Sequence, residues 1–334
     1  FKTENTNHKP PAKSPKRIMS GLAATSTQAV TAPLTRSATF LVLSIANTSA
    51  IPTIRSILAG VSSLVKNVAF RDTGANLTCT VGIGSSVWNE LTNNLPRPKE
   101  LHPFREVKGE RHTAISTPGD LLFHIRSERR DLCFELERQL MDSLGDSVHL
   151  VDATVGFRYF DSRDLLGFVD GTANPVGPHI WPSVLVGSEE DQSIQGGSYV
   201  VVQKYVHDLT SWKSLRVEQQ EQIIGRTKSD NIELNDVEDG KQASHKTLNT
   251  IEDEAGDEHD IFRDNMPFGS PAEGQFGTYF IGYTRRLWVI EKMLERMFVG
   301  YPPGLHDRIL DFSTPLTGTT FFVPSATVLD RLDS

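Results

Sequence analysis

Five polar or ionisable side chains in the second half of the chain could together perform proton or metal chemistry. They occur in short, recognisable stretches: Asp170 in "GFVDG", His207 in "KYVHD", His245 in "ASHKT", Arg263 in "FRDNMPFG" and Asp307 in "GLHDRIL". A carboxylate can carry a proton, an imidazole can ligate a transition metal, and a guanidinium can stabilise developing negative charge. The residue types are therefore those of a redox or acid–base centre.

Each of these residues also has an ordinary structural interpretation. Asp170 stands in a glycine-rich turn, where an aspartate often bonds the neighbouring backbone. His207 lies at the end of a strand pattern and His245 in a polar loop, so the first could be a packed histidine and the second a solvated one. Arg263 could pair with any nearby acid, and Asp307 could begin a helix. No single residue decides between the two interpretations.

The hydrophobic pattern indicates which elements must position these residues. Apolar residues alternate or recur at helical spacing, which predicts strands and helices in a regular order. In the first half we expect strands at 39–45, 77–83, 120–127 and 148–160 and helices at 51–68, 87–95 and 129–144. In the second half we expect strands at 197–208, 276–285 and 319–325 and a helix at 286–300. The β-α-β-β-α-β order is typical of a ferredoxin-like fold.

We therefore predict an α+β protein made of two ferredoxin-like halves, with antiparallel sheets and peripheral helices. The expected domains are 36–160 and 161–334. Residues 1–35 are rich in Lys, Pro, Ser and Thr, which predicts a disordered tail. The acidic, polar stretch at 225–260 has no clear period, and a loop of that length is expected to surround a site or to be partly disordered.

Composition restricts the partners of the protein. The formal net charge of −8 argues against a nucleic-acid surface, which would carry clustered basic residues. No apolar run approaches the ~20 residues that cross a bilayer, so we expect no membrane partner. Cys79 and Cys133 are too few for a disulfide framework and are expected to be packing residues. We therefore expect a small-molecule partner and a cytoplasmic location. Because the sequence begins with Phe1 and not with Met, we also expect that some upstream sequence was removed.

Taken in order, the motifs resemble those of the dye-decolourising peroxidase family of haem proteins. "GFVDG" is followed by "TANP", "SYVVVQKYVHDL", "EQIIGRTK", "SH", "RDNMPFG" and "LDFSTPLTGTTFFVPS", in the order of that family. The resemblance extends from about Thr39 to Leu329 and is strongest to the compact subgroup called type B. It implies two ferredoxin-like halves with haem b (iron protoporphyrin IX) bound between them in the second half.

On the distal side of the haem, the resemblance implies three functional residues. Asp170 corresponds to the acid–base residue, Arg263 to the distal arginine and Asn265 to a third polar group. A carboxylate there would move a proton between the two oxygens of peroxide. The arginine would stabilise the charge that develops as the O–O bond lengthens, and its proximity would hold Asp170 ionised.

On the proximal side, the resemblance implies that His245 is the iron ligand and Asp307 the acid that binds its other ring nitrogen. Such a carboxylate gives the imidazole imidazolate character, which stabilises high-valent iron. His245 precedes the distal arginine by 18 positions, which favours it over His207. Arg226 resembles a haem-propionate partner. Lys246 departs from the family's usual "SHV".

The implied function is a haem-dependent peroxidase that uses hydrogen peroxide to oxidise dyes, phenolics or other organic reductants through a high-valent iron intermediate. The resemblance also suggests a homo-oligomer. Large dyes cannot enter a small peroxide pocket, so electrons are expected to cross from a surface residue, the candidates being Trp181, Trp212, Trp288 and Tyr283. Two alternatives remain open: a haem-handling or porphyrin iron-removal protein, and a haem-free module in which the acidic segment 252–260 binds a ligand or metal.

Overall fold

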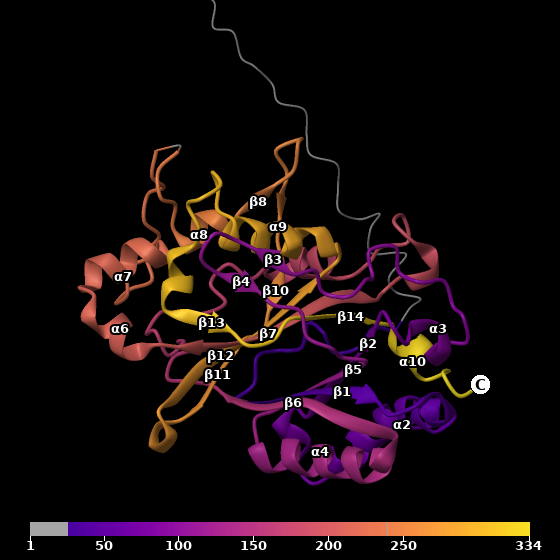
Figure 1. The fold of residues 1–334 in the computed structure, drawn as a ribbon. Helices are drawn as coiled ribbons and strands as arrows, with labels where there is room; N and C mark the ends of the chain where they lie inside the picture. Colours follow the sequence, from indigo (N-terminus) through magenta and orange to yellow (C-terminus); the bar gives the residue numbers. More distant parts are fainter. Residues whose placement is uncertain (1–25, 239) are drawn as a thin grey trace, which may run out of the picture.

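The structure is a computed structural model that describes residues 26–238 and 240–334. A ten-stranded sheet crosses the molecule, and its described strand pairs are all antiparallel (Figure 1). Its strand order is β10-β12-β7-β14-β2-β5-β1-β6, with β11 paired to β12 and β13 paired to β7. In Figure 1, α2 and α4 lie at the bottom and α9 at the top, with strands between them.

The first half has the predicted ferredoxin-like topology. Its fourth strand pairs with the first, the first with the third, and the third with the second. Both helices pack on the same face, where α4 contacts α2 and two of the strands. The elements are β1 (Ser37–Ile45), α2 (Ile51–Ala69), β2 (Thr78–Gly84), β5 (Leu121–Ser127), α4 (Arg130–Leu144) and β6 (Val148–Phe157).

The second half repeats this strand order, which confirms the paired ferredoxin-like fold. Its elements are β7 (Ser198–His207), β10 (Phe262–Arg263), β11 (Met266–Ser270), β12 (Gln275–Thr284), α9 (Leu287–Phe298) and β14 (Thr319–Val323). The pairs Phe321–Gly84 and Phe322–Ile83 join β14 to β2, so the two predicted sheets form one.

Shorter elements complete the chain. They are α3 (Trp88–Leu91), β3 (Val107–Lys108), β4 (Thr113–Ala114), α5 (Ile180–Val184), α6 (Leu209–Ser214), α7 (Val217–Ile224), α8 (His245–Leu248), β8 (Ile251–Glu252), β9 (Glu258–His259), the 3-10 helix η8 (Arg308–Asp311), β13 (Ser313–Pro315) and α10 (Ala326–Leu329). The long polar stretch after α7 therefore contains a one-turn helix and a short hairpin, β8–β9.

The predicted tail is too long at its C-terminal end. Residues 1–25 of that prediction lie outside the described residues. Residues 26–35 pack against the sheet, because Val30 is 1% exposed and the Gln28 amide bonds the backbone of Val81 and Pro324. These two residues help to anchor the segment, and the Ser- and Thr-rich composition around them gives no sign of their burial.

Helix α2 differs from the expectation about membrane segments. By length and composition alone, Thr48–Ala69 could cross a membrane, with a mean hydropathy of 1.2. In the structure its apolar stripe, which includes Ile54, Leu58 and Val61, is buried in the core shared with α4 and the sheet. The spacing of that stripe is the one expected of an amphipathic core helix.

Candidate active site

The loop that carries Asp170 is anchored by alternate apolar residues. Leu166 and Phe168 are buried in a small core cluster with Trp212 of α6. The indole Nε1 of Trp212 donates a hydrogen bond of 2.9 Å to the carbonyl of Leu166, and its ring meets that of Phe168 edge-on at 6.3 Å. Burial of these two side chains fixes the loop just before Asp170.

Glycines give this loop its shape. Gly167 and Gly171 have φ angles of +98° and +75°, in the left-handed region that other residues avoid. The backbone N–H of Gly171 donates to Oδ1 of Asp170 at 2.6 Å, so the aspartate does bond its own turn. Asp170 therefore does have the structural role of bonding the neighbouring backbone. That bond uses Oδ1 and leaves Oδ2 available for other partners.

Asn265 is the side chain that contacts the Asp170 carboxylate. Its Nδ2 lies 3.1 Å from Oδ2 and 3.4 Å from Oδ1 of Asp170, while its Oδ1 accepts the backbone N–H of Ile281 at 3.0 Å. The amide is therefore oriented by strand β12. Asp170, Asn265 and Arg263 line one cavity of about 40 Å³.

Arg263 is fixed through its backbone and free at its side chain. Asn174 accepts from the Arg263 N–H at 3.0 Å and donates to its carbonyl at 2.7 Å. Among the described residues, the guanidinium has no hydrogen-bond or ion-pair partner, and its Nε is buried without one. Within the described part of the chain it forms no ion pair with Asp170, and the expectation that its proximity holds that carboxylate ionised stays a prediction.

On the other side of the candidate site, His245 is bonded to Asp307. The Nδ1 of His245 lies 2.6 Å from Oδ2 of Asp307, which is fully buried, and Oδ1 of Asp307 accepts the Ile309 N–H at 3.1 Å. Asp307 therefore both begins a helical turn, η8, and holds the imidazole. Within the described part of the chain, Nε2 of His245 makes no hydrogen bond.

Local contacts set the position of His245. Ser244 begins α8, and its Oγ accepts the N–H of Thr247 at 3.3 Å. Asn249 donates from Nδ2 to the carbonyl of His245 at 2.8 Å. Sequence reasoning did not identify Asn249 or Asn174 as site residues. For Asn174 a signal existed, because it is the third residue of the "TANP" motif.

His207, the alternative ligand, has no free ring nitrogen. Its Nδ1 bonds Ser313 Oγ at 2.8 Å and its Nε2 bonds Thr278 Oγ1 at 2.9 Å. Burial lowers the pKa of His207 to about 4. It is a packed, neutral histidine that joins three strands.

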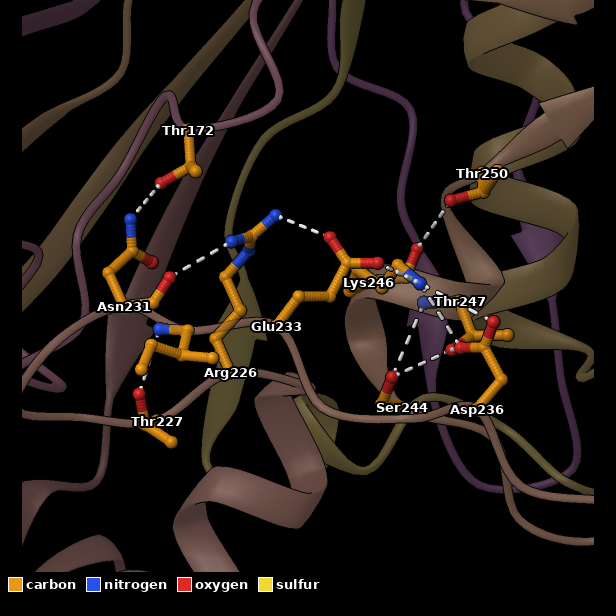
Figure 2. A network of polar contacts seen from close by, with 11 residues as sticks. Thr172, Arg226, Thr227, Asn231, Glu233, Asp236, Ser244, Lys246, Thr247 and Thr250 are labelled. Carbon is orange, nitrogen blue, oxygen red and sulfur yellow. Dashed lines mark hydrogen bonds and ion pairs between the residues drawn. The ribbon is translucent and has the colours of Figure 1, made fainter.

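Arg226 is part of a polar network that links the two sides of the site (Figure 2). Its Nη2 donates to Glu233 at 2.9 Å and its Nη1 to the carbonyl of Asn231 at 3.1 Å. The Asn231 amide donates to Thr172, two residues after Asp170 in the chain, and Lys246 forms an ion pair of 2.8 Å with Glu233. The hydrogen bond from Lys246 lowers the pKa of Glu233. Lys246, which stands where the family usually has valine, therefore forms an ion pair in this network.

The donor set fits a haem. One imidazole has its Nδ1 bound to a buried carboxylate and its Nε2 available, and a carboxylate, an amide and an unpartnered guanidinium meet at a separate cavity. A larger cavity of about 330 Å³ lies between α9 and the segment 104–108 and contains none of the six predicted site residues. The fold and the site together define a protein of the haem peroxidase class.

Comparisons with known proteins specify the family. The C-terminal domain model of Dyp-type peroxidases matches residues 161–328, and the N-terminal domain model matches residues 27–158. A dye-decolorizing peroxidase of Mycobacterium tuberculosis is 52% identical over 309 residues, 92% of this chain and 91% of the relative. The chain belongs to the Dyp-type peroxidase family.

Solved structures agree with this assignment. The structure of DyPB from Rhodococcus jostii RHA1 superposes with a TM-score of 0.87 at 51% identity, covering 91% of this chain and 97% of that one. A dye-decolorizing peroxidase from Bacteroides thetaiotaomicron superposes with a TM-score of 0.87 at 41% identity, covering 93% and 99%. A deferrochelatase of Escherichia coli is 26% identical over 54% of this chain. The chain is a DyP-type peroxidase, and its match to the deferrochelatase is partial.

Proposed function

We propose that this peroxidase binds haem b and uses hydrogen peroxide to oxidise dyes, phenolics or other organic reductants. The observation that carries the proposal is the pairing of His245 with the buried Asp307, which leaves Nε2 of the imidazole available. Variants of the R. jostii protein have been solved in complex with haem, which supports the choice of cofactor.

The proximal residues would hold the haem and determine how strongly the imidazole donates electrons to its iron. Haem supplies an iron that reacts with peroxide and accepts electrons from a reductant. His245 donates its Nδ1–H to Asp307, which fixes the tautomer and leaves the lone pair on Nε2, so this nitrogen would be the ligand to the haem iron. Negative charge on Asp307 makes the imidazole a stronger donor. Arg226, 17% exposed at its side chain and held by Glu233, is the proposed propionate partner.

The distal residues would handle protons and charge. Asp170 takes a proton from one oxygen of hydrogen peroxide and delivers it to the other, directly or through one water. Asn265 orients the carboxylate, and Arg263 offers an unpartnered guanidinium to the developing negative charge. The arginine and the asparagine replaced in haem-bound variants of the R. jostii protein stand two positions apart, as do Arg263 and Asn265.

The haem content of two histidine variants tests the proposal. His245→Ala should lose most of its haem, because iron retention depends mainly on the axial bond. His207→Ala should retain haem, since both its ring nitrogens bond protein hydroxyls. Absorbance of the Soret band per chain measures the result. Normal haem loading of His245→Ala would contradict the proposal.

We also infer a homo-oligomer, a cytoplasmic location, and no nucleic-acid or membrane partner. The family resemblance supports the oligomer, and the net charge of −8 supports the exclusion of nucleic acid. Light scattering of the purified protein measures its mass in solution, and a monomer would contradict the first inference. Fractionation of expressing cells tests the location and any membrane association.

A further inference from the structure

Two histidines and an aspartate that are not among the predicted haem-site residues meet near the surface. The Nε2 atoms of His112 and His306 lie 3.2 Å and 2.9 Å from the same atom, Oδ1 of Asp311. The two imidazole rings are 5.0 Å apart between centroids. All three potential ligand atoms lie within 4.8 Å of one another.

The three residues come from different parts of the fold. His112 belongs to the turn between β3 and β4 in the first half, whereas His306 follows α9 and Asp311 ends η8 in the second half. A bound ion would therefore connect the first half to the loop that also contains Asp307, the residue after His306.

Both loops are held in place by backbone contacts that do not involve the three ligand side chains. The N–H of Gly109 bonds the carbonyl of His112 at 3.0 Å, and Gly109 lies so close to Phe298 that an added Cβ would be 1.9 Å from its carbonyl oxygen. The Gln242 amide donates to the carbonyl of His306 at 2.9 Å. The ligands are thus partly preorganised, which lowers the entropic cost of binding an ion.

The charges and distances suit a transition-metal cation. The two histidines offer imidazole nitrogens and Asp311 offers a carboxylate oxygen, which are ligand types that such a cation takes. Tetrahedral Zn²⁺ takes imidazole nitrogens and carboxylate oxygens at about 2.0–2.2 Å, which places neighbouring ligand atoms about 3.4 Å apart. The two nitrogen–oxygen distances need to increase only slightly.

We propose that His112, His306 and Asp311 bind one divalent transition cation of the Zn²⁺ class, with water at the fourth position. None of the three residues belongs to the proposed peroxidase centre. Its ion would tie the β3–β4 turn to the loop that follows α9 and so stabilise the junction of the two halves.

Equilibrium dialysis of the haem-loaded protein against ZnCl₂, after treatment with a chelator, tests this proposal. The unaltered protein should retain one Zn²⁺ per chain more than His112→Ala does. Loss of one ligand should weaken binding at this site by at least about 10-fold, the smallest effect expected even for residues that only support ligands. His149→Ala removes an exposed histidine of β6 and should bind Zn²⁺ like the unaltered protein.

Thermal unfolding gives a second readout. Zn²⁺ should raise the unfolding midpoint of the unaltered protein and of His149→Ala, because the ion binds the folded state, but not that of His112→Ala. His112→Ala should keep its haem and its reaction with peroxide, so failure of the metal site is distinguishable from failure of the proposed function. Identical Zn²⁺ titrations for the unaltered protein and His112→Ala would overturn the proposal.

Discussion

At the residue scale, the two distal groups have different polar surroundings. Asp170 is oriented by Asn265 and by its own turn, whereas Arg263 has no polar partner among the described residues. A buried guanidinium nitrogen without a partner is costly unless a ligand satisfies it. The unpartnered guanidinium of Arg263 is therefore consistent with a role in binding negative charge on the substrate. Proton transfer would then be the role of Asp170.

Replacing Asp170 or Arg263 should separate these two roles. Asp170→Ala and Arg263→Leu should both retain haem, because neither residue ligates iron. The first should slow the reaction with peroxide by ~10²–10⁴ through loss of a general base, and the second by ~10²–10³ through loss of charge stabilisation. Stopped-flow spectroscopy of the haem bands measures both rates. If both variants reacted at the unaltered rate, the distal roles would be wrong.

The motifs point to candidate site residues but not to the residues that hold them in place. Asp170 and His245 lie in stretches whose order along the chain is characteristic. Asn174 instead bonds the backbone of a residue 89 positions away, and Asn249 bonds within its own helical turn. An amide that satisfies one backbone group leaves no periodic pattern in the sequence, so these positioning roles require the structure.

At the element scale, a buried ion pair connects the turn between β10 and β11 to the first half of the chain. Asp264 stands between Arg263 and Asn265, and its Oδ2 lies 2.7 Å from Nη1 of Arg126 on β5. The exposed fractions of the two side chains are 1% and 0%. Burial raises the pKa of Asp264, and the Arg126 charge opposes that shift. The pair fixes the short turn from which both distal side chains project.

Breaking this pair should cost both stability and reactivity. Asp264→Asn leaves the buried Arg126 charge without a counterion, which should lower the free energy of unfolding by about 3–5 kcal/mol. The displaced turn should also slow the peroxide reaction. Denaturant unfolding and stopped-flow measurements check the two effects.

A double replacement provides the control for this experiment. Asp264→Leu combined with Arg126→Met removes both charges, so it should recover most of the lost stability. A double variant as unstable as Asp264→Asn would show that packing, not the uncompensated charge, is responsible.

The packed histidine of β7 should make stability depend on pH. Burial lowers the pKa of His207 from about 6.5 when unfolded to about 4 when folded, so below pH 6.5 the unfolded state binds more protons. The stability contributed by neutral His207 is complete above pH 6.5 and is lost as the pH falls toward 4. The largest loss is about 3 kcal/mol.

Urea unfolding midpoints at pH 7 and pH 4.5 measure this effect. His207→Gln, which cannot take up a proton, should lose less stability on acidification than the unaltered protein. His149→Gln, which replaces an exposed histidine of β6, should behave like the unaltered protein. An equal loss in all three proteins would assign the pH dependence to other groups.

Regular elements could be predicted and irregular ones could not. The long strands and the helices α2, α4 and α9 follow strong apolar periods and match the expected ranges closely. Strand β11 is not among the expected strands. Pro267 interrupts its apolar pattern, but an edge strand tolerates proline, and among the described strands β11 pairs with β12 alone. The one-turn helix α8 depends on the Ser244 cap and the Asp307 bond, and four residues have no measurable period.

At the scale of the whole molecule, an edge strand of one half pairs with an edge strand of the other. The fourth strand of the second half, β14, pairs with the second strand of the first half, β2. Each half alone would expose this edge, and pairing the two edges removes a site of aggregation. The repeat of strand order was predictable from the sequence, but the junction was not, because it depends on tertiary contact between distant strands.

The overall arrangement also limits how electrons enter from a bulky reductant. A cavity of about 40 Å³ beside Asp170 excludes a dye, so the dye must give up its electron at the surface. Of the four candidates, Trp212 and Tyr283 are 1% and 0% exposed, and Trp288 is half-buried against the ring of His259. Trp181 is 46% exposed, at the start of α5, which follows the Asp170 loop in the chain.

Replacing Trp181 should therefore impair dye oxidation without impairing the reaction with peroxide. In Trp181→Phe, kcat with a bulky dye should fall several-fold, because phenylalanine is far harder to oxidise than tryptophan, while haem content and stopped-flow peroxide kinetics stay unchanged. Trp288→Phe is the matched control, since its half-buried ring offers a dye less contact. A dye turnover that fell in Trp288→Phe and not in Trp181→Phe would move the entry point to α9. Unchanged turnover in both would exclude a tryptophan entry point at either position.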